Sequence, residues 1–138
     1  MFGAYKTKAN KITGITWAEI GKKAMMHFKI IAARTKRRPY VRSAYFRKEK
    51  IFLELFWHHL YEKQNVRDKA RRAKYFLCAI ELIEHSRIAP TVKENPNRHG
   101  EMLYRFFGTA ANGDAFVVQI KEVKRTGEKW LMSVFPKE

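Results

Sequence analysis

The chain has 138 residues, a length that fits one domain of ordinary size. Its 29 lysine and arginine residues face only 13 acidic residues, which gives a formal net charge of +16. Aromatic residues make up 14% of the chain, which excludes a protein that is only a disordered basic tail. The charge favours nucleic acid as the partner, because cations that bind phosphates release counterions into solution.

Membrane and secreted classes are disfavoured by the sequence. No apolar stretch approaches the roughly 20 residues that span a bilayer, and residues 1–15 lack the apolar region of a signal peptide. The single cysteine, Cys78, cannot form an internal disulfide, and its apolar surroundings indicate a core position. These features predict a cytoplasmic protein with no membrane partner.

The sequence does not favour a metal or cofactor site. His58 and His59 are adjacent, and neighbouring residues on a helix point about 100° apart, so they chelate one ion poorly. The chain has no HExxH, CxxC, GxGxxG, P-loop or GxSxG motif. We therefore expect neither a metal site nor a cofactor.

The chain is predicted to start with a flexible basic tail, residues 1–16, which is rich in lysine, glycine and threonine. A single α+β domain follows over residues 17–138, with a helical part at 17–89 and a sheet part at 90–138. Thr16 and Glu19 have the spacing of a capping box, which predicts a first helix over 17–33.

A basic connector, residues 34–42, follows this helix. Five of its nine residues are basic, and Pro39 prevents the helix from continuing. Ser43 can cap a second helix that ends near Gln64, and Asn65 can cap a third helix that ends near Ser86.

Basic residues in three segments are candidate phosphate contacts: the connector, the outer face of the third helix, and a loop predicted over 90–100. A hydrated surface is the alternative for the helix face. The candidates are Arg34, Lys36, Arg37, Arg38, Arg42, Arg67, Arg71, Arg72, Arg98 and His99.

After this loop the hydrophobic period changes from 3.6 to 2, which predicts strands over 102–108, 115–123 and 129–135. Gly113 and Gly127 each end a predicted three-residue hairpin loop. The expected fold is therefore α+β, with three N-terminal helices followed by a twisted antiparallel sheet of three to four strands.

These loops fix a register that gives the sheet two different faces. One face is apolar, includes Trp130, and must pack on the helices. The other face aligns Arg105, Gln119 and Ser133 on adjacent strands, with Lys121 beside them. Such a row can bind a phosphate, or it can be an ordinary hydrated sheet face. Four apolar residues share this face: Leu103, Val117, Leu131 and Phe135.

From about Lys74 onward the chain resembles the barnase–EndoU–colicin–RelE-like ribonuclease fold, which occurs in small toxins of phages and mobile elements. The resemblance rests on the helix end 80–86, on the loop 88–91, and on the strand segments 103–108, 116–121 and 132–136. Members of this superfamily cut RNA without a metal. The resemblance implies the same activity for this chain.

The resemblance also implies roles for individual residues. By matching positions, Arg105 and Lys121 would hold the phosphate, and Ser133 would be the polar residue of the last strand, next to Gln119 in the row. His85, at a helix end, would exchange protons, and His99 is the competing candidate.

Three functions remain open at this point. The leading one is an RNA-binding, metal-independent endoribonuclease of toxin type, acting on free RNA, ribosome-bound mRNA or tRNA, with an acidic antitoxin as a second partner. The others are a non-catalytic RNA- or ribosome-binding module and a DNA-binding accessory protein of a mobile element. DNA ranks lower, because the third helix offers Arg67 and Arg71 but no amide to pair with adenine.

Overall fold

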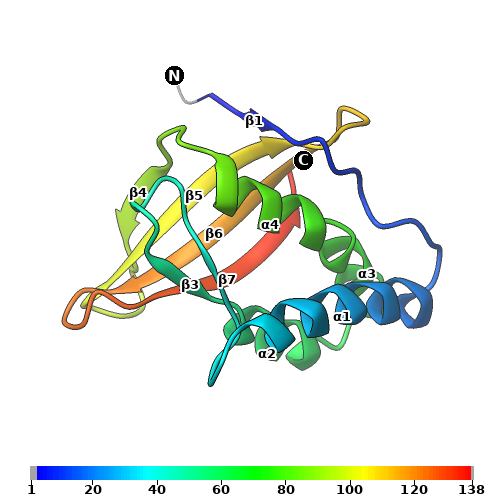
Figure 1. The fold of residues 1–138 in the computed structure, drawn as a ribbon, viewed down its shortest axis with the longest axis horizontal. Coiled ribbons are helices and arrows are strands. Elements are labelled where there is room, and N and C mark those ends of the chain that lie inside the picture. Colours follow the sequence, from blue (N-terminus) through cyan, green and yellow to red (C-terminus); the bar gives the residue numbers. More distant parts are fainter. Residues whose placement is uncertain (1–2, 138) are drawn as a thin grey trace.

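The computed structural model describes residues 3–137, which form four helices and seven strands (Figure 1). In chain order these are β1 (Tyr5–Lys6), α1 (Trp17–Arg34), β2 (Tyr40–Arg42), β3 (Lys50–Phe52), α2 (Glu54–Glu62), α3 (Val66–Ala73), α4 (Phe76–His85), β4 (Thr91–Glu94), β5 (Glu101–Thr109), β6 (Ala115–Val123) and β7 (Lys129–Pro136). The protein is α+β, but the predicted order of three N-terminal helices followed by three or four antiparallel strands is wrong.

The seven strands form one mixed sheet that curls around the helices (Figure 1). Its order is β1-β5-β6-β7-β3-β2, and β4 also pairs with β5. Strands β5 to β7 are antiparallel to their sequence neighbours, as expected. The loop predicted over 90–100 is wrong in part, because residues 91–94 form β4 and pair with β5. Strand β1 pairs with β5, and β3 pairs with β7, in parallel. Strand β1 therefore lies at one edge of the sheet, and the hairpin of β2 and β3 lies at the other, with β2 outermost.

The second predicted helix is the main error in secondary structure. Its first half forms the turn and strand β3 of an antiparallel hairpin, whose other strand, β2, lies in the predicted connector 34–42. The capping signal at Ser43 is used in a turn, because Ser43 Oγ accepts a hydrogen bond from Phe46 N at 2.9 Å. Val41 and Ile51, which pair across this hairpin, are both buried. Burial of these two side chains outweighs the helical spacing of the sequence.

The other helix starts lie where the sequence predicts them. Thr16 caps α1 by accepting a hydrogen bond from Glu19 N, and Asn65 caps α3 by accepting one from Asp68 N. The third predicted helix is divided in two, because α3 ends at Ala73 and α4 begins at Phe76. Local side-chain capping thus fixes both starts, and the break after Ala73 lets α3 and α4 pack separately.

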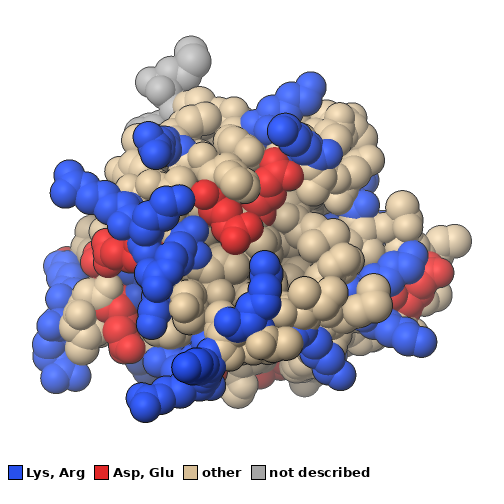
Figure 2. All heavy atoms as spheres, viewed as in Figure 1, with Lys and Arg blue, Asp and Glu red and all other residues tan. Residues whose placement is uncertain are grey.

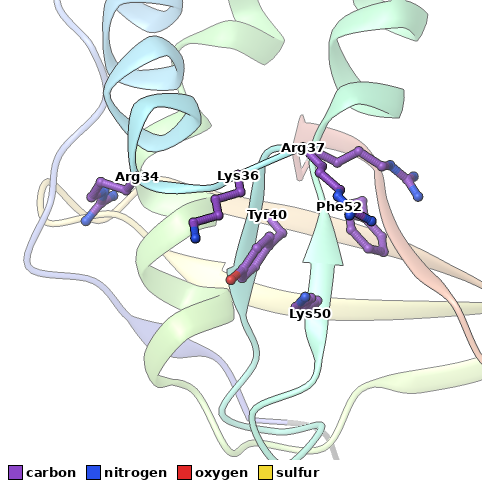
Figure 3. Close-up of a pocket in the computed structure, with 7 residues that line it drawn as sticks. Arg34, Lys36, Arg37, Tyr40, Lys50 and Phe52 are labelled. Atoms are coloured by element: carbon purple, nitrogen blue, oxygen red, sulfur yellow. The ribbon is translucent and has the colours of Figure 1, made fainter.

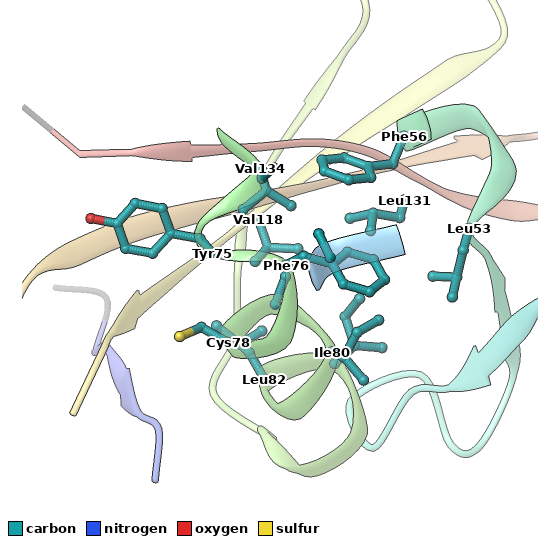
Figure 4. Packing of buried hydrophobic residues seen from close by; sticks show 14 of the residues in the cluster. Leu53, Phe56, Tyr75, Phe76, Cys78, Ile80, Leu82, Val118, Leu131 and Val134 are labelled. Carbon is teal, nitrogen blue, oxygen red and sulfur yellow. The ribbon is translucent and has the colours of Figure 1, made fainter. Parts of the chain in front are cut away.

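The helices pack on one face of the sheet and enclose the core (Figure 4). Phe56 of α2, Phe76 of α4 and Val118 of β6 are almost completely buried there. Cys78 is also buried and unpaired, and burial raises the pKa of its thiol, so this residue is a core position as predicted. No helix within residues 3–137 is both long enough and apolar enough to cross a bilayer.

The segment predicted as a flexible tail lies against the domain over its described part, whereas Met1 and Phe2 are outside the described residues. Strand β1 pairs with β5, and Ile12 is buried. The carboxylate of Glu81 on α4 accepts hydrogen bonds from Tyr5 Oη, Lys8 N and Ala9 N at 2.8–3.1 Å. Glu81 therefore connects the N-terminal segment to the helical layer.

Removal of this carboxylate is expected to destabilise the protein. Burial alone would raise the pKa of Glu81, but the three hydrogen bonds lower it below its ordinary value of 4.5. A carboxylate whose pKa is lower in the folded than in the unfolded state stabilises the fold above pH 4.5. This stabilisation is lost as the pH falls through the folded-state pKa. Glu81→Ala should lower the free energy of unfolding at neutral pH by about 1–3 kcal/mol.

Denaturant titration at neutral pH and well below pH 4.5 measures this effect. The difference in free energy of unfolding between wild type and Glu81→Ala should become smaller at the acidic pH. Glu84→Ala, on the same helix, is the control, because Glu84 makes no such hydrogen bonds within the described residues. Equal stabilities of Glu81→Ala and Glu84→Ala at neutral pH would contradict the role given to Glu81.

Candidate functional site

The polar row predicted from the sequence is present on the face of the sheet opposite the core. Arg105 of β5 pairs with Gln119 of β6, which pairs with Ser133 of β7. Arg105 Nε donates a 2.7 Å hydrogen bond to Gln119 Oε1, and Gln119 Nε2 lies 3.3 Å from the sulfur of Met132. Gln119 is only 7% exposed, so its amide is a fixed acceptor that orients the exposed guanidinium of Arg105.

The two hairpins that set this register differ from each other. The first is as predicted, with Ala110 N bonded to Asp114 O at 2.8 Å and Gly113 at a φ of 98°. The second has a four-residue loop, because Val123, not Lys124, pairs with Glu128.

A register shift between Gln119 and Ile120 compensates for the longer loop, and Met132 becomes the extra residue of a β-bulge. Three predicted orientations are therefore wrong, those of Leu131, Trp130 and Met132. Leu131 pairs with Ile120 and is fully buried in the core, and Trp130 pairs with Lys121 on the outer face. The bulge leaves the side chain of Met132 beside Gln119.

Arg72, on α3, joins the row from outside the sheet. Its Nη1 donates a 2.8 Å hydrogen bond to Ser133 Oγ, and its Nε donates a 3.0 Å hydrogen bond to Asp68 Oδ2. Burial alone would raise the pKa of Asp68, but Arg72 and Lys63 lower it, so the carboxylate holds Arg72 in a charged pair. Ser133 Oγ accepts from Arg72, and its own O–H can still donate to a ligand.

Phe135 of β7 connects the two arginines. The guanidinium carbons of Arg72 and Arg105 lie 5.5 and 5.6 Å from the centroid of its ring. Both guanidinium groups thus lie against one aromatic ring, and both are held through Nε by a side-chain acceptor. The remaining N–H donors can bind an anion.

His59, on α2, completes the site at the edge of β7. Its Nδ1 lies 3.3 Å from the backbone oxygen of Met132, the bulged residue. If Nδ1 carries the proton and donates to this oxygen, the lone pair of the neutral ring is on Nε2. The ring is half-buried and lines the same hollow as Gln119 and Ser133.

This hollow has a volume of about 460 Å³. Its lining residues come from α2, α3, β6 and β7 and the short connection after α2: His59, Glu62, Lys63, Arg72, Gln119, Met132 and Ser133. Glu62 pairs with His58 at 2.9 Å, and Asp68 is shared among cations, so the two nearby carboxylates are already engaged. The hollow combines an imidazole, a hydroxyl, an amide and two cations with the carboxylate of Glu62.

Four predicted catalytic residues are not among those that line the hollow. Arg105 lies beside it, with its Nε bonded to Gln119. Lys121 is on the same face, but its ammonium is 3.6 Å from Glu101. His85 is at the exposed end of α4, in the helical layer on the other side of the sheet. His99 is fully exposed in the turn between β4 and β5, 3.2 Å from Glu94. The structure therefore does not bring either predicted histidine to the row.

His59 is the residue that sequence reasoning missed as a site residue. Its helical spacing with Phe56 and Leu60 marked it as part of an apolar stripe. The edge of β7 that it contacts is defined only by the tertiary structure, so the sequence held no direct signal. Among residues 3–137, no three His, Cys, Asp or Glu side chains form a cluster that could hold a metal ion.

The predicted nucleic-acid contacts occupy separate surfaces. Arg34, Lys36, Arg37 and Arg38 line a second pocket of about 480 Å³ (Figure 3). Arg42 lies on β2, Arg67 and Arg71 lie on α3, and Arg98 and His99 lie in the turn after β4. On the face seen in Figure 2, basic side chains occur both at the margin and toward the centre, and carboxylates gather near α4 and lie among the basic side chains elsewhere. This face therefore has no single basic patch.

Comparisons with protein-family models, with curated proteins and with solved structures found no match.

Proposed function

We propose that the protein is a cytoplasmic, metal-independent endoribonuclease of toxin type that cleaves RNA in the hollow beside the polar row. The observation that carries this proposal is the pair formed by Arg72 and Arg105, which lie against the same ring of Phe135 and are each fixed through Nε. Two fixed guanidinium groups are suited to stabilise the negative charge that a phosphate gains in the transition state.

The proposed reaction is an internal transesterification. The 2′-oxygen attacks the adjacent phosphorus, the bond from phosphorus to the 5′-oxygen breaks, and the products carry a 2′,3′-cyclic phosphate and a 5′-hydroxyl. His59 Nε2 accepts the proton of the 2′-hydroxyl, and water that enters the open hollow protonates the leaving oxygen. Arg72, Arg105 and the Ser133 hydroxyl bind the phosphate oxygens.

His59 takes the role that the resemblance implies for His85, with His99 as the competing candidate. It lines the hollow with Gln119 and Ser133, and its hydrogen bond to the Met132 backbone fixes the orientation of the ring. Lys121, which is engaged by Glu101, becomes a residue that contacts RNA farther along the same face.

The first test is incubation of the purified protein with RNA in the presence of EDTA. Cleavage should continue, because arginines supply the positive charge that the reaction needs. The products should carry a cyclic phosphate, which mass spectrometry detects. An oligonucleotide with 2′-deoxyribose at the cleaved position should stay intact, since it lacks the nucleophile.

Two results would contradict the proposal. The first is a folded protein that binds RNA but cuts neither free nor ribosome-bound RNA, which would favour a non-catalytic RNA- or ribosome-binding module. The second is cleavage of the 2′-deoxy substrate, which would require a different nucleophile. Tighter binding to duplex DNA than to RNA would favour the DNA-binding alternative.

A further inference from the structure

We propose that the outer face of the sheet holds single-stranded RNA between the polar row and the pocket formed by the basic connector. This inference rests on the proposed function and adds to it the class of substrate. The connector pocket would bind nucleotides on one side of the scissile phosphate. The ring of Tyr40 and the guanidinium of Arg38, which lies over the Phe52 and Trp130 rings, would stack the bases between the two places.

The connector pocket carries positive charge that the protein does not neutralise. Its lining holds five basic and two aromatic residues and no carboxylate. Arg38 is paired with Glu54 and Glu128. The other four cations have no acidic partner within ion-pair distance among residues 3–137: Arg34, Lys36, Arg37 and Lys50. A bound phosphate would relieve the repulsion among these cations.

The arrangement of the side chains suits a nucleotide. In Figure 3, Lys36 and Lys50 lie near the ring of Tyr40, whereas Arg34 and Arg37 extend in opposite directions. Lys50 Nζ is 4.7 Å from the centroid of the Tyr40 ring. An aromatic ring between two cations can stack a base while the cations bind the neighbouring phosphates.

The sheet register connects this pocket to the polar row. Tyr40 pairs with Phe52, Phe52 pairs with Trp130, and Trp130 pairs with Lys121. Paired residues project to the same face, and so do Lys121 and Gln119, which are two positions apart on β6. Strand spacing and rise per residue place the Cα atoms of Tyr40 and Gln119 about 16 Å apart, a span that a few nucleotides cover.

The side chains along this path fit single-stranded RNA better than a duplex. The guanidinium of Arg38 lies 3.9 Å from the centroid of the Phe52 ring and 4.3 Å from that of Trp130. Bases can stack on the Tyr40 ring and on the planar guanidinium of Arg38. In a duplex the faces of the bases are already stacked on one another, so they are not available to these side chains.

The bulge at Met132 is part of this arrangement. It turns Trp130 to the outer face, where Trp130 lies between Phe52 of β3 and Lys121 of β6 in the row of paired residues. Without the register shift, Trp130 would point into the core and the aromatic path would be interrupted at β7. The same bulge therefore shapes the hollow and the path that leads to it.

The test measures binding of uncleavable, 2′-O-methyl RNA, so its outcome does not depend on cleavage. The probes are a single strand of about ten nucleotides, a duplex of the same length and a dinucleotide. The variants are Tyr40→Ala and the double variant Lys36→Ala with Lys50→Ala, whose lysines are both exposed. The control is Lys22→Ala with Lys29→Ala, exposed lysines of α1 that remove the same charge.

Tyr40→Ala should weaken binding of the long single strand by about 5- to 150-fold, the range expected for loss of one stacked base. The double lysine variant should weaken it at least as much, the control should change it little, and neither connector variant should change binding of the dinucleotide. The duplex should bind more weakly than the single strand of the same length.

Equal losses of RNA affinity in the control and in the connector double variant would contradict a defined RNA path. They would show that the overall positive charge of the protein attracts the RNA. Unchanged binding in both connector variants would also overturn it, whether or not the protein cleaves RNA. A duplex that binds as tightly as the single strand, with the same dependence on Tyr40, would overturn the assignment to single-stranded RNA. If the expected binding pattern appears and no RNA is cleaved, the path stands and only the catalytic proposal fails.

Discussion

Arg105→Ala is expected to slow RNA cleavage by about 100- to 1,000-fold and to leave the fold and most of the RNA affinity unchanged. Arg105 is exposed, and its Nε is held by Gln119, so its terminal nitrogens are free to bind the scissile phosphate. One contact among many phosphate contacts adds little to ground-state binding. Its contribution grows in the transition state, where negative charge accumulates on the phosphate.

Substitutions of Arg72 test whether the geometry of a fixed guanidinium, and not only its charge, is needed for cleavage. Its guanidinium binds Asp68 and Ser133 in two directions at once. A lysine keeps the charge but cannot reproduce this fork, so Arg72→Lys should lose nearly as much activity as Arg72→Ala. His59→Ala should lower the rate of cleavage, because the 2′-hydroxyl loses its proton acceptor.

Single-turnover cleavage rates and the affinity for uncleavable RNA separate these effects. Arg125→Ala, at the exposed tip of the second hairpin, is the matched control and should behave like the wild type. A fall in affinity that accounts for the whole fall in rate would show that Arg105 only binds RNA, and full activity of Arg72→Lys would contradict the fixed geometry of the site.

The features that the sequence predicted depend on contacts between residues close together in the chain. Thr16 and Asn65 cap helices through hydrogen bonds that span three residues. The turn at Gly113 fixes the pairing of β5 with β6, and this pairing aligns Arg105 with Gln119. A short turn propagates its register along two strands, so half of the polar row follows from a local signal.

The features that the sequence missed depend on contacts between distant segments. Strand β3 is only three residues long, and it exists because it can pair in parallel with β7. The position of His59 depends on the packing of α2 along the open edge of β7. Helical spacing could identify the helix that carries His59, but it could not identify the strand edge beside it.

The bulge in β7 is another feature that the sequence did not predict. A loop with four residues instead of three would move the whole strand by one position, which would turn Ser133 into the core. The bulge at Met132 compensates for the extra loop residue, so Ser133 still pairs with Gln119, as the predicted register has it. Leu131, in contrast, lies on the core face and Trp130 on the outer face, the reverse of the prediction. The row was predicted correctly although one of the two loops was not.

Leu131→Asp is therefore expected to unfold the protein. Leu131 has no exposed surface and packs in the core with Ile120 of β6. An unpaired carboxylate at this position costs several kcal/mol, which is comparable to the total stability of about 5–15 kcal/mol of a typical domain. Circular dichroism and denaturant titration would detect the loss of cooperative unfolding.

Met132→Asp is the matched test of the bulge, because the same charge is placed one residue farther along the strand. The side chain of Met132 lies beside Gln119 in a hollow lined by Lys63 and Arg72, so a carboxylate there meets water and cations. This variant should stay folded and lose RNA cleavage, because its negative charge repels the scissile phosphate where the cations attract it. The register predicted without a bulge reverses the two outcomes, with Met132 in the core and Leu131 outside. A folded Leu131→Asp variant together with an unfolded Met132→Asp variant would contradict the bulge and remove Met132 from the hollow.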